Sequence, residues 1–233
     1  MKAALSHPNA RRRAAMVAVL AAVLIVPGPA RPALAASAAE KLVEESRFSL
    51  ERMLVDDELP ELKGYVTRAR GLLIVPQLVK GGFIFGAEAG TGVLMVRGGD
   101  GSWSAPAFYT LAAGSIGLQI GGQVSEVVFT VMSEGAVEAL LRSGVKLGVD
   151  LSITVGPIGK GLEASTTTNL SADVFAFSKN VGLFGGGALE GAKLFARKKL
   201  NEAYYGTGAT PRAIVIARDF FNPQAEKLRQ AAP

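Results

Sequence analysis

The stretch that decides the fold is Gly71–Trp103, which reads GLLIVPQLVKGGFIFGAEAGTGVLMVRGGDGSW. Small and large residues alternate along it, so Phe83, Phe85 and Ala87 would share one face of an extended chain. Near its end, Gly98–Gly101 has the composition of a turn that joins antiparallel strands. Glycine inside a strand marks a tight bend or the close approach of another backbone. The stretch therefore predicts antiparallel strands in a curved sheet.

Further segments downstream also have the composition of strands. The alternation continues at 114–123 (GSIGLQIGGQ), and Val127–Met132 (VVFTVM) is apolar throughout, as in a buried strand. Val149–Val155 alternates again, and two more strands are expected around Leu162–Asn169 and Asp173–Lys179. Strands that are this numerous and rich in glycine are typical of a curved antiparallel sheet or a barrel.

Apolar residues at helical spacing predict helices mainly on either side of these strands in the sequence. The helices are expected at Ala38–Glu58, from Leu62 to Gly71, after the N-cap Ser133, at Ala192–Tyr205 and at Pro223–Gln230. No low-complexity linker or internal repeat divides the chain. The predicted fold class is therefore α+β, with a glycine-rich curved antiparallel sheet or barrel and with N-terminal and C-terminal helices.

The N-terminal segment has the organisation of a cleaved signal peptide. Arg11–Arg13 form a positive region, Ala14–Val26 is a short apolar run, and Ala33–Ala35 supplies a small-x-small cleavage pattern. No cysteine follows the apolar run to carry a lipoprotein anchor. We therefore expect residues 1–35 to be removed, residues 36–233 to form a single domain, and the protein to be periplasmic or secreted.

Removal of this leader changes the charge balance. Five of the 25 basic residues and none of the 20 acidic ones lie in residues 1–35, so 20 of each sign remain. A net charge of zero gives no support to nucleic-acid binding. The remaining charge is uneven, because residues 36–61 hold eight acidic and three basic residues, whereas residues 62–233 hold 17 basic and 12 acidic.

The same cleavage limits the chemistry available to the protein. His7 is the only histidine, it lies in the leader, and the sequence contains no cysteine. Catalysis by Ser-His-Asp or Cys-His groups is therefore excluded after cleavage, as are zinc sites that use His or Cys. Catalysis by carboxylates remains an alternative, although no pair of them surrounds a recognisable site. We expect a non-enzyme without a cofactor or a bound metal.

Two glycine-rich motifs superficially resemble nucleotide-binding loops. The first, Gly156–Gly161 (GPIGKG), has glycine where a P-loop needs a serine or threonine hydroxyl for magnesium. In the second, Gly185-x-Gly187 is followed by Glu190 at the third glycine position of a dinucleotide fingerprint. Neither motif predicts a bound nucleotide, and the glycines are better explained by strand bending and packing.

Five collinear blocks carry a resemblance to a known family. In chain order they are ARGLLIVPQLVKGGFIFGAEAGTGVLMVR, WSAPAFYTLAAGSIGLQIGGQVSEVVFTVM, LGVDLSITVGP, DVFAFSKNVGLFGGGALEGAKL and LNEAYYG. Together they cover nearly all of residues 40–210, and the chain resembles the SYLF-domain family. The resemblance implies a lipid-binding module, with phosphoinositide binding and actin regulation described for eukaryotic relatives. It also associates binding with an N-terminal amphipathic helix and basic residues.

The strongest local basic feature is the run Arg197, Lys198 and Lys199. Consecutive residues of a helix point in widely different directions, so all three cannot be buried. The run is either an ordinary solvated helix face or a contact for anionic headgroups. Tyr204 and Tyr205 follow it and would lie at the headgroup level in the second interpretation, whereas packing is the commoner role of neighbouring aromatic residues.

The helix that matches the family's lipid-binding helix supplies Lys41, Arg47 and Arg52 as further candidates. On balance this helix is acidic, which favours core packing over membrane contact. We therefore expect reversible binding to an anionic phospholipid surface, such as phosphatidylglycerol or cardiolipin, led by the Arg197 run. The alternative is an envelope scaffold that uses the same surface for a protein partner.

Overall fold

The long strands that the sequence predicts form the centre of the fold. The computed structural model of the chain describes residues 30–82, 85–116, 121–142, 144–156, 172–179 and 191–233. Pro32–Pro233 form one unit, to which all the packing described below belongs.

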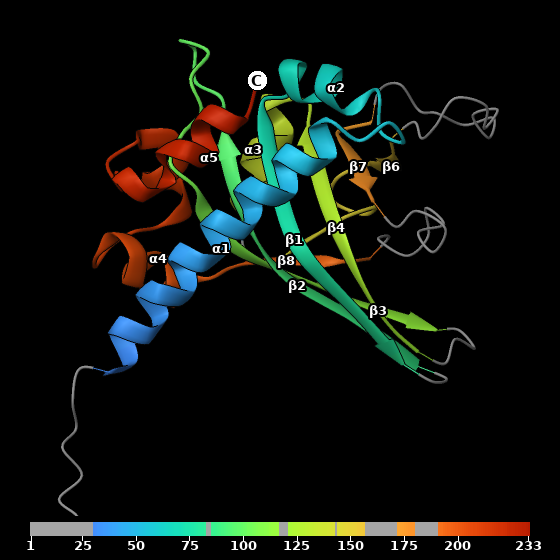
Figure 1. The fold of residues 1–233 in the computed structure, drawn as a ribbon, viewed down its shortest axis with the longest axis horizontal. Coiled ribbons are helices and arrows are strands. Elements are labelled where there is room, and N and C mark those ends of the chain that lie inside the picture. The colour runs from blue at the N-terminus through green and yellow to red at the C-terminus, as the bar shows by residue number, and fades with distance from the viewer. Residues whose placement is uncertain (1–29, 83–84, 117–120, 143, 157–171, 180–190) are drawn as a thin grey trace, which may run out of the picture. The chain divides into compact units, whose positions relative to one another are not determined.

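The described residues form eight strands in one sheet, in the order β5-β8-β3-β2-β1-β4-β7-β6. The strands are β1 (Gly71–Gly82), β2 (Phe85–Val96), β3 (Ala107–Ile116), β4 (Gly121–Val131), β5 (Val145–Lys146), β6 (Ile153–Val155), β7 (Val174–Ser178) and β8 (Lys193–Ala196). All neighbours are antiparallel except β6 and β7, which are parallel. Figure 1 shows the sheet curling, with β1 to β4 as its long central strands. The predicted fold class is confirmed.

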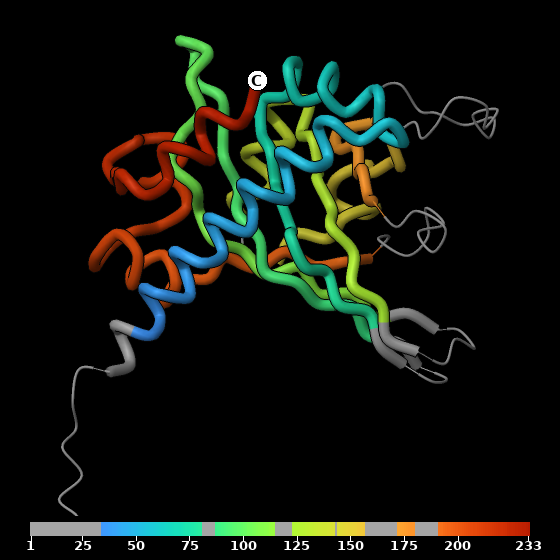
Figure 2. The backbone as a smooth tube through the Cα atoms, in the orientation of Figure 1, coloured from blue at the N-terminus to red at the C-terminus, as the bar shows by residue number. Residues whose placement is uncertain are grey.

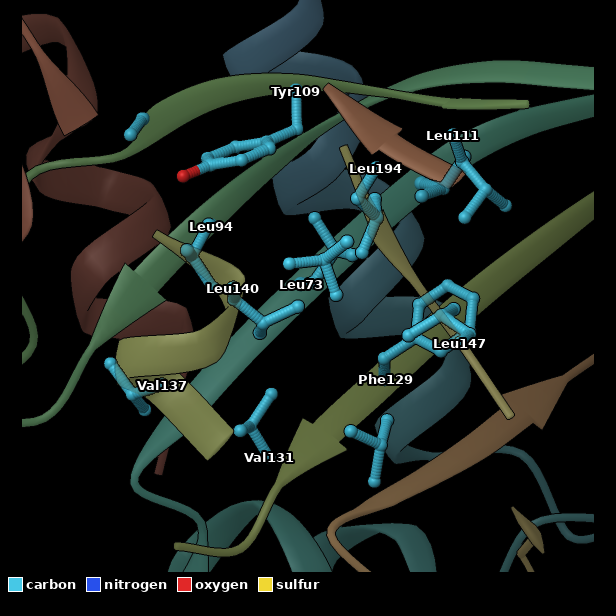
Figure 3. Packing of buried hydrophobic residues seen from close by; sticks show 14 of the residues in the cluster. Leu73, Leu94, Tyr109, Leu111, Phe129, Val131, Val137, Leu140, Leu147 and Leu194 are labelled. Atoms are coloured by element: carbon cyan, nitrogen blue, oxygen red, sulfur yellow. The ribbon is translucent and has the colours of Figure 1, made fainter. Parts of the chain in front are cut away.

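Side chains alternate between two faces of the sheet, and each face contributes to its own core. The face that we call the α1 face carries Ile74 and Val128 and packs with helix α1 (Ala30–Leu54), which crosses it diagonally in Figure 2. The opposite face carries Leu73 and Phe129, which belong to a second buried cluster that Figure 3 shows from close by. The two-residue period of a strand thus divides the apolar side chains between two layers.

Two strand glycines lie where another backbone approaches closely. The register of β1 shifts between Ile74 and Gln77, which is a bulge that brings this part of β1 against β2. A Cβ atom at Gly92 would overlap the carbonyl oxygen of Ile74, and one at Gly90 would lie 2.6 Å from Val75 Cγ1. The prediction that strand glycines permit bending and close approach is confirmed at these two positions.

Each of the remaining helices buries side chains in one of the two cores. They are α2 (Leu62–Arg68), α3 (Glu134–Leu140), α4 (Lys198–Tyr205), the π-helix η3 (Ala213–Ala217), the 3-10 turn η4 (Pro223–Ala225) and α5 (Glu226–Ala231). Ser133 caps α3 as predicted, because its side-chain oxygen accepts a hydrogen bond of 3.1 Å from the Ala136 N–H. Helix η3 was not predicted from the sequence.

Two predicted elements are wrong in part. The first half of the predicted strand Val149–Val155 is a turn, in which Asp150 accepts the Lys146 N–H at 2.8 Å, so the strand begins only at Ile153. The predicted helix Ala192–Tyr205 begins with strand β8, and α4 starts only at Lys198. In the first case a local hydrogen bond of the Asp150 side chain overrides the apolar pattern, and in the second case pairing of β8 with β3 and β5 does so.

Several predicted features lie outside the described residues: the leader at 1–29, the alternation at 83–84, the strand at Leu162–Asn169 and the motif at Gly185–Glu190. Of the GPIGKG motif only Gly156 is described, and a Cβ atom there would overlap the ring of Phe177. Packing against a buried strand thus accounts for this glycine.

Candidate functional site

One row of side chains crosses six strands on the α1 face, and we call it the outer row. Directly opposed residues on neighbouring strands share a face, and the register places in this row Val124, Val79, Ala89, Ala112, Lys193 and Lys146. Val79 and Val124 are 49% and 53% exposed, respectively. The outer row therefore presents exposed aliphatic side chains at one end and two lysines at the other.

A second row, the inner row, runs beside it on the same face. It consists of Gln77, Thr91, Thr110 and Phe195, which are opposed on β1, β2, β3 and β8. Arg197 directly precedes α4, and its side chain extends over this row. Its Nη1 donates to Thr110 Oγ1 at 3.2 Å and to Thr91 Oγ1 at 3.4 Å. Two hydroxyls and one guanidinium therefore converge on adjacent strands.

A groove of about 450 Å³ lies between the inner row and α1. Thr91, Thr110 and Arg197 line it from the sheet side, and Leu42 and Glu45 line it from α1. The Glu45 carboxylate lies 3.5 Å from the ammonium of Lys41 and accepts a hydrogen bond of 3.4 Å from Gln77. The groove thus has a cationic group and hydroxyls on one wall and a compensated carboxylate on the other.

The two lysines of the outer row oppose each other directly across β5 and β8. Like charges at opposed strand positions destabilise a sheet. Within the described residues, neither Lys146 nor Lys193 has a carboxylate within ion-pair distance, although Asp150 bonds the backbone N–H of Lys146. Sequence reasoning missed both lysines as site residues, because only the pairing of β5 with β8 brings them together.

The predicted run Arg197, Lys198 and Lys199 is exposed, but it does not lie on one helix. Arg197 is the N-cap residue of α4 and precedes the helix, with its side chain held on the inner row. Lys198 and Lys199 begin α4, and the Lys198 ammonium lies 3.9 Å from the carboxylate of Glu202. The run follows β8, the strand that carries Lys193, and Arg197 lies four positions along the chain from that lysine.

The predicted α1 candidates are engaged with carboxylates. Arg47 bonds Glu44 and Glu51 on its own helix, and its hydrogen bond lowers the pKa of Glu44. Arg52 pairs with Glu126 of β4, and Lys41 pairs with Glu45. Because each of these three cations has an acidic neighbour, α1 offers little uncompensated positive charge.

Tyr204 and Tyr205 are packed, in accordance with the commoner of the two interpretations. Tyr204 is 7% exposed, and its ring lies 5.2 Å from that of Phe108. The Tyr205 hydroxyl donates to the Pro106 carbonyl at 2.8 Å, and burial raises the pKa of both tyrosines. Both rings therefore contribute to packing between α4 and the residues around it.

Among the described residues, no helix combines the length with the apolar character that a membrane span requires. The described surface combines exposed aliphatic residues with two lysines, Lys146 and Lys193, that have no acidic partner. It also carries the Arg197 guanidinium beside the hydroxyls of Thr91 and Thr110. Such an arrangement can attract and hold an anionic partner at the surface of the sheet.

Comparison with known proteins adds a family likeness. A family model described as "Ysc84: Las17-binding protein actin regulator" matches residues 112–232. Protein YSC84 of Saccharomyces cerevisiae is 38% identical over 164 residues, which are 69% of this chain and 35% of that protein.

Two further relatives show the same extent of likeness. LAS seventeen-binding protein 3 of Saccharomyces cerevisiae is 36% identical over 154 residues, which are 65% of this chain and 33% of that protein. SH3 domain-containing YSC84-like protein 1 of Homo sapiens is 39% identical over 141 residues, which are 60% of this chain and 41% of that protein. The chain thus spans about a third to two-fifths of the length of these relatives.

Proposed function

The chain belongs to the Ysc84 family, and from this premise we propose that it is a non-catalytic protein that binds anionic phospholipid surfaces reversibly. The family model describes a Las17-binding protein and actin regulator, and one relative is named for binding Las17. The proposal concerns the portion that this chain shares with those longer proteins.

The observation that carries the proposal is that exposed cations and exposed aliphatic residues lie on one face of the sheet, at opposite ends of the outer row. Lys146 and Lys193 end the outer row, and the run Arg197–Lys199 follows β8 directly. Each basic residue near an anionic bilayer contributes on the order of 1 kcal/mol of attraction. Val79 and Val124, each about half exposed, add a small apolar contact at the other end of the row.

We propose that the protein acts after export, in the periplasm or outside the cell. The support is the leader pattern of residues 1–35. In a bacterial envelope such a protein would meet phosphatidylglycerol and cardiolipin, and both are anionic. A surface with local rather than global positive charge suits such a reversible contact.

A protein partner at the same surface is the second candidate. The name of one yeast relative, LAS seventeen-binding protein 3, refers to binding of another protein, and an envelope scaffold could use the same cations and valines for a partner. Such a scaffold would need no affinity for lipid.

Co-sedimentation of the processed protein with vesicles separates the two candidates. We expect binding to vesicles of phosphatidylglycerol and phosphatidylcholine but not to phosphatidylcholine alone, and loss of binding in 1 M salt, where the Debye length falls to roughly 3 Å. Absence of binding to both vesicles would reject the lipid proposal and favour the scaffold.

A triple substitution tests whether lipid binding takes place at the run Arg197–Lys199. Arg197→Gln, Lys198→Gln and Lys199→Gln together should weaken vesicle binding by about tenfold or more, because three surface cations are lost. The matched control removes three exposed cations elsewhere, Lys63→Gln, Arg70→Gln and Lys227→Gln, and should weaken binding less than about threefold. Equal losses in both variants would contradict the assignment of lipid binding to the run Arg197–Lys199.

A further inference from the structure

The groove under α1 combines the groups that bind a phosphate, and this inference rests on the proposed lipid function. We propose that the groove holds the headgroup phosphate of a single phospholipid molecule, bound by the Arg197 guanidinium and by the hydroxyls of Thr91 and Thr110. The protein would first be attracted to the membrane surface, and one headgroup would then bind in the groove.

The donors are suited to a phosphate. Arg197 uses Nη1 for the two threonine oxygens, and within the described residues its Nη2 and Nε make no other hydrogen bond. Each threonine hydroxyl accepts from Arg197 and keeps its own proton for donation to a ligand. A guanidinium and two hydroxyls together offer charge-assisted bonds to two or more phosphate oxygens.

These donors are held in place by the sheet. Thr91 and Thr110 are directly opposed on β2 and β3, two long strands in the interior of the sheet. The backbone of Arg197 is anchored as well, because its N–H donates to the Phe108 carbonyl at 2.8 Å. Little conformational freedom is therefore lost when a ligand binds, which favours affinity.

The other wall of the groove constrains the rest of the headgroup. Glu45 is a hydrogen-bond acceptor there, and its charge is offset by Lys41 and Gln77. A bare phosphate ion would meet this carboxylate as a like charge, whereas the hydroxyls of a phosphoglycerol headgroup can donate to it. A groove of about 450 Å³ also falls within the usual size range of small-ligand pockets.

The outer row provides a path for the acyl chains. Val79 and Ala89 line the groove and are also exposed. The acyl chains of a bound lipid would therefore extend over these two residues towards the bilayer. The phosphate site and the exposed aliphatic residues therefore face the same membrane surface.

The test uses dihexanoylphosphatidylglycerol below its micelle concentration, titrated calorimetrically into the processed protein. Arg197→Lys keeps the charge but loses the planar fork, and Thr91→Val with Thr110→Val removes the hydroxyls while suiting strand positions. Each variant should bind this lipid about tenfold more weakly, because charge-assisted hydrogen bonds are lost. Lys63→Gln is the matched control and should change the affinity less than about twofold, since this exposed lysine does not line the groove and is not part of the run Arg197–Lys199.

The outcomes separate this inference from the proposed function. Unchanged lipid affinity in the Arg197 and threonine variants, with vesicle binding intact, would overturn the groove as the site but leave surface binding standing. Inorganic phosphate that binds as tightly as the short-chain lipid would show that the groove serves free phosphate instead. Failure of the parent protein to bind vesicles at all would reject the proposed function itself.

Discussion

At the scale of single residues, two glycines of β2 allow the bulged part of β1 to approach β2 closely. Gly90 and Gly92 lie under the bulged part of β1, where any side chain would meet backbone or Val75. Gly114 on β3 has open space around the position of a Cβ atom. A glycine-rich composition therefore contains positions with different requirements, which the sequence pattern alone does not separate.

This difference yields a matched pair of substitutions. Gly92→Ala should lower the free energy of unfolding by about 2 kcal/mol, because overpacking forces the backbone of β1 to move. Gly114→Ala should change it by less than about 0.5 kcal/mol. Chemical denaturation of the two variants measures both values, and equal effects would contradict the close approach of β1 to β2.

At the scale of elements, α1 is a structural helix. Val43, Leu50 and Met53 are at most 1% exposed and pack on the sheet. The helix begins its buried contacts at Ala39, which is fully buried, whereas Leu34 is 70% exposed. The core interpretation of its apolar stripe is confirmed, and its cations are compensated by carboxylates.

Deletion of Ala36–Asp57 should therefore abolish cooperative unfolding rather than merely weaken lipid binding. Each buried large side chain that is removed costs about 2–5 kcal/mol, and several together exceed the usual stability of a domain. Thermal unfolding followed by circular dichroism measures this effect. A deletion variant that folds normally but no longer binds vesicles would instead indicate that α1 is the lipid-binding element.

At the scale of the whole molecule, the leader and the folded unit are expected to separate at one site. N-terminal sequencing of the exported protein should begin within a residue or two of Ala36. Because the buried contacts of α1 begin at Ala39, this cleavage should leave the melting temperature of the folded unit within about 2 °C. A retained Met1 in the envelope fraction would contradict the signal-peptide prediction.

The sequence alone determined the fold class, α1, α2, the capped start of α3 and the strands β1, β2, β4 and β7, but it predicted only the last residues of β3, from Gly114. These features follow from local periodicity and turn chemistry, which depend on residues a few positions apart. It also identified the exposed run Arg197–Lys199, because three consecutive cations cannot all be buried. It failed at β8, where a short apolar segment pairs with β3 and β5 instead of continuing as a helix.

Only the tertiary structure decided which residues make up the candidate site. Lys146 and Lys193 are 47 positions apart, and the hydroxyls of Thr91 and Thr110 meet Arg197 from two other strands. Strand periodicity tells which residues share a face of one strand, but register across strands depends on long-range pairing. That pairing places cations, hydroxyls and aliphatic side chains on one surface, which no local pattern contains.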